Sequence, residues 1–226
     1  MNKIYGILII GFLIFGCKEK ASDEKIVESK IEFNQGLANE LKKMAETDQI
    51  AAYIPQGKHK ELSEKEWNEF KDSVFTTHEK RLQEIFNKNG FAGFDLVGKE
   101  GSSNFWVMVQ HSDHNPTFQN KVLEKMKIEV DKKNAEPRKY GLLVDRVKLN
   151  TGKAQIYGTQ TRYNMNTGQA YPKKLEDSVN VNKRRKSIGL EPIELYLNKM
   201  TERHFEMNKE NYINKGITEP KLYKTE

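Results

Sequence analysis

Apolar side chains recur every three or four residues along most of this chain, which is the spacing of one face of an α-helix. The pattern predicts helices near residues 34–52, 63–89, 115–130, 137–152 and 192–216. The second of these is the best marked, because a Ser-x-x-Glu capping box opens it and an Asn-Gly pair closes its last turn. We therefore expect a mainly α-helical fold.

Other segments carry different patterns. Residues 91–101 contain three glycines and are predicted to form a loop, and the apolar run at 105–109 fits a buried helix or a buried strand. Residues 155–163 are rich in threonine and tyrosine, and a turn signal at 166–168 follows them, which predicts one β-hairpin. A short helix is expected at 179–189. The predicted fold is thus a single helical domain with one β-hairpin, and an α+β fold is the alternative.

The N-terminal segment has the layout of a secretory signal. Lys3 precedes an apolar run, and Gly16 and Cys17 follow it. This arrangement resembles a bacterial lipoprotein signal, in which the cysteine becomes the lipidated N-terminus. The run is shorter than the roughly 20 residues needed to span a bilayer, and charged residues follow it. An uncleaved membrane stub and an ordinary secreted protein are the alternatives.

The predicted organisation is a signal peptide at 1–16, a polar tether at 17–32 and a globular domain at 33–226. Acyl chains on Cys17 would hold the protein on a membrane, because each buried methylene contributes about 0.8 kcal/mol and two or more chains bind stably. We therefore expect an envelope protein that is anchored through lipidated Cys17 outside the cytoplasm, on the periplasmic or the surface side.

Composition limits the classes of function. The chain has 226 residues, a formal net charge of +6 and a single cysteine, so it forms no disulfide of its own. A positive charge would suggest nucleic acid in a cytosolic protein, but the exported location argues against that partner. Lysines are interleaved with glutamates on the predicted helix faces, which is typical of a solvated surface. Attraction to anionic lipid or to an acidic polymer stays open.

His111, Asp113 and His114 form a dense group of side chains that carry protons and bind metals. Only the two histidines have a spacing that places ligands on one helix face, so we expect no bound zinc and no cofactor. The stretch also fits the end of one helix and the start of the next, with His111 at the first end and Asn115 as the following N-cap. A structural role and a functional role both stay open.

Asp145 and Arg146 are neighbours on a predicted helix, so they point in different directions and need separate partners. Asp145 lies on the apolar side, where a carboxylate needs an ion pair or several hydrogen bonds. Arg184 or Arg185 is the expected partner of Asp145, and a role for this carboxylate in a site is the alternative.

The predicted strand carries polar side chains in a row. Gln155, Tyr157 and Thr159 alternate onto one face, and Gln160 follows them. Amide, phenol and hydroxyl groups suit the binding of sugars or peptides, although a solvated hairpin face would show the same row. The sequence has no nucleophile elbow, phosphate-binding glycine loop, dinucleotide fingerprint or zinc-protease helix motif.

Several segments together resemble a bacterial domain family of unknown function. They are Asp48-Gln49, the stretch 96–119 with Gln110-His111-Ser112-Asp113, the stretch 142–160 with Asp145-Arg146 and Tyr157-Gly158-Thr159-Gln160, and Arg184–Leu190. The similarity covers residues 35–200. It implies a shared domain and points to a shared site, but it implies no reaction.

We expect the polar residues of these segments to converge on one concave site. The expected site residues are His111, Asp113, Asp145, Arg146, Tyr157 and Gln160. The leading hypothesis is a binding or interaction module for an envelope ligand, either a peptide or a glycan. A hydrolase of envelope polymers, in which His111 acts with Asp113 or Asp145 as acid–base groups, is the alternative. A purely structural envelope protein is a third hypothesis.

Overall fold

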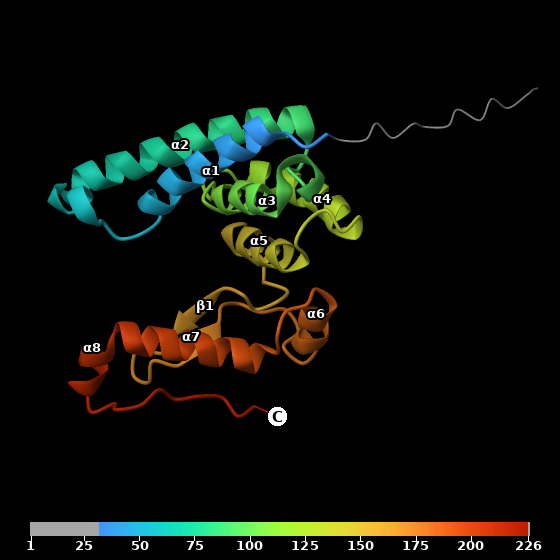
Figure 1. The fold of residues 1–226 in the computed structure, drawn as a ribbon. Coiled ribbons are helices and arrows are strands. Elements are labelled where there is room, and N and C mark those ends of the chain that lie inside the picture. Colours follow the sequence, from blue (N-terminus) through green and yellow to red (C-terminus); the bar gives the residue numbers. More distant parts are fainter. Residues whose placement is uncertain (1–31, 226) are drawn as a thin grey trace, which may run out of the picture. The chain divides into compact units, whose positions relative to one another are not determined.

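The elements of the structure follow the local signals of the sequence closely. The computed structural model describes residues 32–225, and Figure 1 shows them in chain order. The helices are α1 (Gln35–Ala51), the short 3-10 helix η1 (Gly57–Glu61), α2 (Glu64–Asn89), α3 (Phe94–Gln110), α4 (Pro116–Asp131), α5 (Pro137–Asn150), α6 (Val181–Ser187), α7 (Ile193–Met207) and α8 (Lys209–Ile213). Strands β1 (Thr161–Tyr163) and β2 (Ala170–Pro172) pair antiparallel. The prediction of a mainly α fold with one hairpin is confirmed.

Side-chain caps fix the starts of two helices. The hydroxyl of Ser63 accepts from the N–H of Glu66, and the carboxylate of Glu66 accepts from the N–H of Ser63 at 2.8 Å. Asn115 accepts from the N–H of Phe118 at 3.0 Å, and Pro116 occupies the first turn of α4. These caps satisfy N–H groups that have no partner within their own helix, so both helices begin where the sequence predicts.

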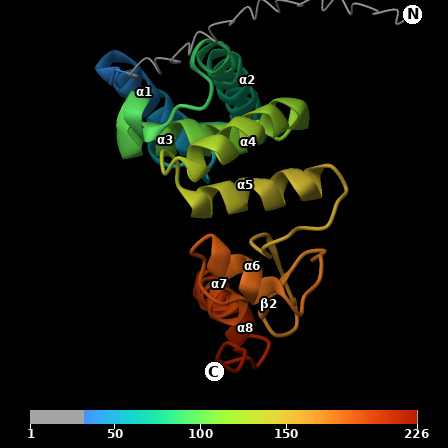
Figure 2. The same ribbon diagram turned by 90° about the vertical axis from the view of Figure 1, so that its right-hand side faces the viewer.

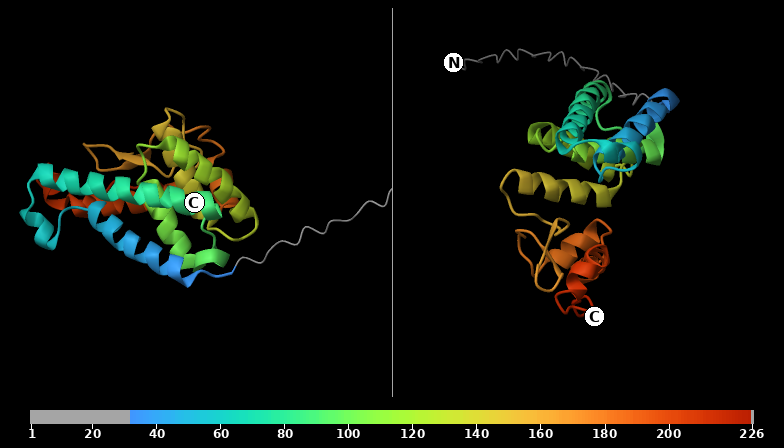
Figure 3. Two further views of the ribbon diagram at one scale, coloured as in Figure 1. Left: turned by 90° about the horizontal axis from the view of Figure 1, so that it is seen from above. Right: turned by 90° about the vertical axis from the view of Figure 1, so that its left-hand side faces the viewer.

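The larger hydrophobic core lies among α1 to α5. α1 and α2 run side by side and both pack on α3, while α4 packs on α5 (Figures 1 and 3). One fully buried side chain from each helix represents this core: Leu41, Leu82, Phe105, Val122 and Leu143. Each such burial contributes roughly 1.5–3 kcal/mol. The core therefore holds the polar groups on these helices at fixed positions.

A smaller core lies in the part of the chain that follows α5. Ala170 of the hairpin packs there with Ile193 and Leu197 of α7, and the N–H of Ala170 donates to the hydroxyl of Thr201 at 2.9 Å. Figure 2 shows α5 between the first helices and the segment formed by the hairpin, α6 and α7. All described residues belong to one compact unit, and α5 is the helix through which its two cores meet.

The loop predicted at 91–101 is largely wrong. α3 begins at Phe94, and its turns continue past Gly98, where φ is +71° and the helix kinks. Gly98 is needed for that backbone conformation, but Gly101 is not a breaker. A Cβ at Gly101 would lie 2.8 Å from the Cβ of Val97, closer than two such atoms come, so this glycine makes room for Val97 beside the kink. The apolar run that follows is helical, which excludes the strand alternative.

The strand predicted at 155–163 is shorter than expected. Only Thr161–Tyr163 pairs with the second strand. The backbone N–H groups of Ile156, Tyr157 and Thr159 donate to the side chain of Asp145 instead of to a neighbouring strand. The expected row of polar side chains on one strand face therefore does not form.

The C-terminal helices lie where the sequence pattern predicts them, but the last one is shorter than predicted. The short helix predicted at 179–189 is α6. The long helix predicted at 192–216 is divided, because α7 ends at Met207 and α8 follows. The side chain of Asn208 donates to the carbonyl oxygen of His204 at 2.8 Å and marks the break.

The predicted signal peptide, Cys17 and nearly all of the tether lie outside the described residues. In residues 32–225, no helix combines the length and the apolar character that crossing a bilayer requires. The lipoprotein interpretation therefore stays a prediction.

Candidate functional site

A histidine and a buried aspartate meet beside α1, α2 and α3. His111 is the C-cap of α3, and its Nδ1 lies 2.7 Å from Oδ2 of the fully buried Asp48 in α1. An ionised carboxylate only accepts hydrogen bonds, so Nδ1 carries the proton and donates it. Nε2 of His111 has no hydrogen-bond partner within residues 32–225, and 19% of the His111 side chain is exposed.

α2 supplies further side chains around this pair. Nδ1 of His78 lies 4.0 Å from Oδ1 of Asp48, which is too long for a hydrogen bond. Both atoms are buried and have no hydrogen-bond partner within residues 32–225. The Phe75 ring lies tilted against the His111 ring, with centroids 5.3 Å apart. One oxygen of Asp48 thus accepts from His111, and the other lies 4.0 Å from Nδ1 of His78.

A second histidine and carboxylate lie next along α2. Nε2 of His114 is 2.5 Å from Oε2 of the buried Glu79, and Oε1 of Glu79 accepts from Asn115 at 2.7 Å and from Gln83 at 2.8 Å. We call Asp48, His78, Glu79, His111 and His114 the histidine–carboxylate cluster. It holds three of the five histidines of the chain. Such a concentration of titratable groups is frequent at functional sites, although structural ion-pair networks show it as well.

Asp48 is held in its charged form. Burial alone would raise the pKa of this carboxyl, but hydrogen bonding from His111, the nearby His78 and a 3.0 Å hydrogen bond from Gln49 outweigh burial and lower the pKa below its ordinary value. Asp48 therefore stays an acceptor at neutral pH and fixes the orientation and tautomer of the His111 ring.

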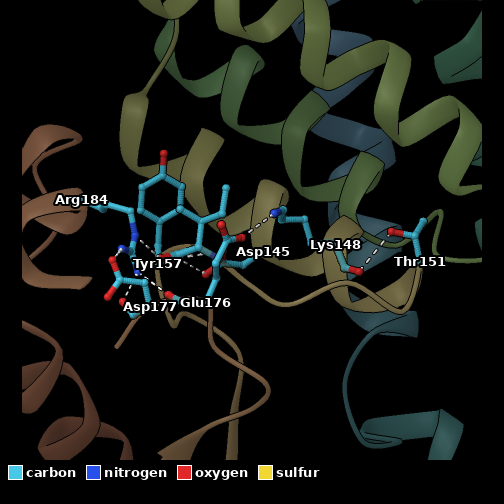
Figure 4. A network of polar contacts seen from close by, with 8 residues as sticks. Asp145, Lys148, Thr151, Tyr157, Glu176, Asp177 and Arg184 are labelled. Carbon is cyan, nitrogen blue, oxygen red and sulfur yellow. Dashed lines mark hydrogen bonds and ion pairs between the residues drawn. The ribbon is translucent and has the colours of Figure 1, made fainter. Parts of the chain in front are cut away.

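Asp145 has a different role, because it holds a loop against α5. Figure 4 shows its carboxylate beside Tyr157 in the segment that follows α5. One oxygen accepts from the N–H groups of Ile156 at 2.7 Å and of Tyr157 at 2.9 Å. The other accepts from the N–H and the hydroxyl of Thr159, both at 2.9 Å. This fully buried carboxylate is completely satisfied, as buried carboxylates must be in a stable fold.

The expected ion pair between Asp145 and an arginine is wrong. Arg184 donates to the carbonyl oxygen of Ile156 at 2.9 Å, and Arg185 donates to that of Tyr157 at 2.6 Å. The two arginines thus donate hydrogen bonds to carbonyl groups of the same loop whose N–H groups donate to Asp145. The loop is held from both sides by charged side chains, and no direct contact between the charges is needed.

Asp113 joins the corner between α3 and α4 to α5. Its Oδ1 accepts from Arg146 at 2.8 Å and from Asn150 at 2.7 Å. Burial would raise the pKa of Asp113, but hydrogen bonding and the charge of Arg146, together with Gln119, lower it below the ordinary value. The pair is partly exposed, and such pairs contribute little to stability.

The predicted site residues therefore fall into three contact groups. These are His111 with Asp48, Asp113 with Arg146, and Asp145 with the loop that carries Tyr157 and Gln160. No hydrogen bond or ion pair between described residues joins one group to another. Burial raises the pKa of the Tyr157 phenol, and Gln160 donates through its N–H to Gln155 at 2.9 Å, which is again a contact inside the loop.

A surface hollow of about 550 Å³ lies beside the histidine–carboxylate cluster. It is lined by Glu46, Gln49, Ile50, Tyr53, Ile54, Gln56, Gly57 and His59. Three of its apolar side chains are strongly exposed, with Ile50 at 45%, Tyr53 at 56% and Ile54 at 69% of their full surface. Exposed apolar groups that gather with amides in a hollow of this size are typical of binding sites.

Two lining residues connect the hollow to the interior. The His59 ring packs against Trp67 and Phe70, with centroids 5.7 and 5.1 Å away, so aromatic rings support this wall. Gln49 lines the hollow and donates to Oδ2 of Asp48, the same oxygen that accepts from His111. Within residues 32–225, the hydrogen bond from Gln49 to Asp48 thus connects the hollow to the cluster.

Sequence patterns alone did not identify Asp48 as the partner of His111. One signal was present, because Asp48 continues the stripe of Leu37, Leu41 and Ala45 that faces the core. An acidic residue on such a stripe must be paired when it is buried. Its partner is 63 residues away in the chain, and no local pattern shows a contact of that separation.

The fold and these contacts define a mainly helical domain with a buried histidine–carboxylate cluster and an adjoining hollow. The model of a family of unknown function, DUF6624, matches residues 35–208, and the chain belongs to this family. Neither the curated proteins nor the solved structures gave a match.

Proposed function

We propose that this chain is a bacterial lipoprotein of the cell envelope whose helical domain binds a polar envelope ligand. The anchor would be Cys17, because the apolar run and Gly16 before it have the layout of a lipoprotein signal. The domain would then be held outside the cytoplasm by acyl chains, with the tether between them.

The hollow beside α1 is the observation that carries the binding function. Tyr53 and Ile54 offer an exposed ring and an exposed apolar side chain, and Gln49 and Gln56 offer amides. A ring that stacks on an apolar face, next to amides that exchange hydrogen bonds, suits a ligand with both sugar and peptide groups. Fragments of peptidoglycan combine these groups and occur in the envelope.

Calorimetric titration of the domain, residues 32–226, with a disaccharide-peptide fragment of peptidoglycan tests this function. Tyr53→Ala should weaken binding about tenfold, which corresponds to about 1.4 kcal/mol. Tyr171→Ala is the matched control, since Tyr171 is an exposed tyrosine on the hairpin, outside the lining of the hollow. Titration with the free disaccharide and with the free peptide assigns the half of the ligand that is recognised. Absence of binding, or equal weakening by both variants, would contradict the proposal.

A further inference from the structure

A serine and a lysine meet in the wall of a small cavity between α3 and α5. Nζ of Lys139, in the first turn of α5, forms a hydrogen bond with Oγ of Ser103 in α3. Both residues line a cavity of about 120 Å³, and both are partly exposed. The two side chains therefore touch each other and also face a space that a small molecule can enter. This cavity shares no lining residue with the hollow beside α1.

Trp106 positions this lysine from α3. Its Nε1–H donates to the backbone carbonyl oxygen of Lys139 at 2.8 Å, and its ring centroid lies 5.2 Å from Nζ of the same residue. Lys148, the other lysine of α5, is paired with the carboxylate of Glu176 at 3.1 Å. Lys139 has a hydroxyl as its partner instead, which is the contact of a base with a nucleophile.

The surroundings of Lys139 favour its uncharged form. Burial lowers the pKa of this amine below its ordinary value, and the charge of Glu136 offsets part of that effect. The first turn of a helix acts in the same direction as burial, because this end of the helix dipole is positive. Lys99 adds another positive charge to the lining, while the face of the Trp106 ring favours the ammonium. An uncharged amine has a lone pair that accepts the proton of the Ser103 hydroxyl.

The cavity suits a short acyl group. Its apolar wall consists of Phe91, Phe94, Trp106 and Met126. Its volume is well below the roughly 300–1,000 Å³ of pockets that enclose a drug-sized ligand. It would therefore hold the acyl end of a molecule beside Ser103 and leave the remainder of that molecule outside.

We propose that Ser103 is a catalytic nucleophile that accepts a short acyl group, with Lys139 as its general base. A serine hydroxyl is a weak nucleophile until a neighbouring base takes its proton, and lysine is the base in Ser–Lys sites. The substrate class is a carboxylic acid derivative whose acyl chain fits the cavity. This inference is independent of the ligand proposed for the hollow beside α1.

The reaction has two stages. In the first, Nζ of Lys139 takes the proton of Ser103 while Oγ bonds to the acyl carbon and the carbonyl electron pair moves onto its oxygen. When that pair returns, the bond from carbon to the leaving group breaks, and Nζ gives its proton to the leaving group. In the second stage, Nζ activates one water in the same way, and the bond from the acyl carbon to Oγ breaks. The products are a carboxylic acid and the protonated leaving group, and both side chains are restored.

The reagent p-nitrophenyl acetate tests this inference on the domain, residues 32–226, because it joins a short acyl group to a coloured leaving group. We expect a burst of about one nitrophenolate per chain, and mass spectrometry of the digested domain should find the acetyl group on Ser103. Ser103→Ala should abolish the burst. Lys139→Arg keeps a positive charge but cannot act as a base, so it should slow acetylation by about 10²–10⁴-fold.

A pH profile separates a general base from a structural partner of Ser103. The acetylation rate of the natural domain should rise with pH as Lys139 loses its proton, and it should level off below about 10.4, the ordinary pKa of lysine. This limb should be absent in Lys139→Arg, whose side chain does not titrate in that range.

Lys148→Arg is the matched control, because it makes the same change on the same helix in a lysine outside the cavity lining. It should acetylate at the rate of the natural domain, and circular dichroism should show that every variant is folded. The inference is overturned by an absence of acetyl on Ser103 or by acetylation of Lys139 in its place. An unchanged rate in Lys139→Arg would overturn it as well.

Discussion

Asp145→Ala is the sharpest test of how this fold is held together. The substitution removes the acceptor of three buried or half-buried backbone N–H groups, those of Ile156, Tyr157 and Thr159. Each unsatisfied donor costs roughly 1–3 kcal/mol, so the three together cost about 3–9 kcal/mol. Water that enters the vacated space will satisfy part of this loss. We therefore expect the free energy of unfolding to fall by about 4 kcal/mol.

Urea unfolding of the domain at neutral pH, followed by circular dichroism, measures this loss. For a domain of this size a loss of about 4 kcal/mol lowers Tm by roughly 8–16 °C. Asp113→Asn is the control, because its partly exposed pair with Arg146 should contribute less than about 1 kcal/mol. A loss below about 1 kcal/mol for Asp145→Ala, or a loss equal to that of the control, would refute the assigned role of this carboxylate.

Two further predictions concern the anchor and the cluster. Cys17→Ala should release the protein from the membrane fraction of cells, and retention after a high-salt wash would contradict the lipoprotein interpretation. Asp48 should contribute stability that is complete above its ordinary pKa, about 4, and that is lost as pH falls through its lowered pKa in the folded state. Urea midpoints below about pH 4 should therefore fall less steeply for Asp48→Asn than for the natural chain, and parallel curves would disprove this contribution.

The helices were predictable wherever a local contact decides the structure. The capping box of Ser63 with Glu66 and the cap at Asn115 act within three residues, so the sequence pattern contains the whole interaction. Glycines were the main source of error, because a glycine can lie inside a helix as well as end one. Gly98 is needed for a positive φ, whereas Gly101 makes room for the side chain of Val97 beside the kink.

The candidate site was predictable in its residue types and not in its pairings. His111 was identified from its neighbours in the sequence, but the choice between Asp113 and Asp145 as its partner missed Asp48, which lies on another helix. Tyr157 alternates with polar neighbours as a strand residue would. Its N–H nevertheless donates to the carboxylate of Asp145 in the preceding helix. A side-chain acceptor on another element does not change the spacing of apolar residues, so the sequence pattern does not reveal it.

The two buried aspartates also show how function is best sought in a helical domain without a known activity. A buried carboxylate with a structural role accepts hydrogen bonds on both of its oxygens. Asp145 does so with the N–H groups of the loop that leads to the second core. Asp48 is buried to the same degree, but its donors on one oxygen are the side chains of His111 and Gln49, and its other oxygen lies 4.0 Å from Nδ1 of His78. The search for a ligand should therefore begin where Gln49, which donates to Asp48, lines the surface hollow beside α1.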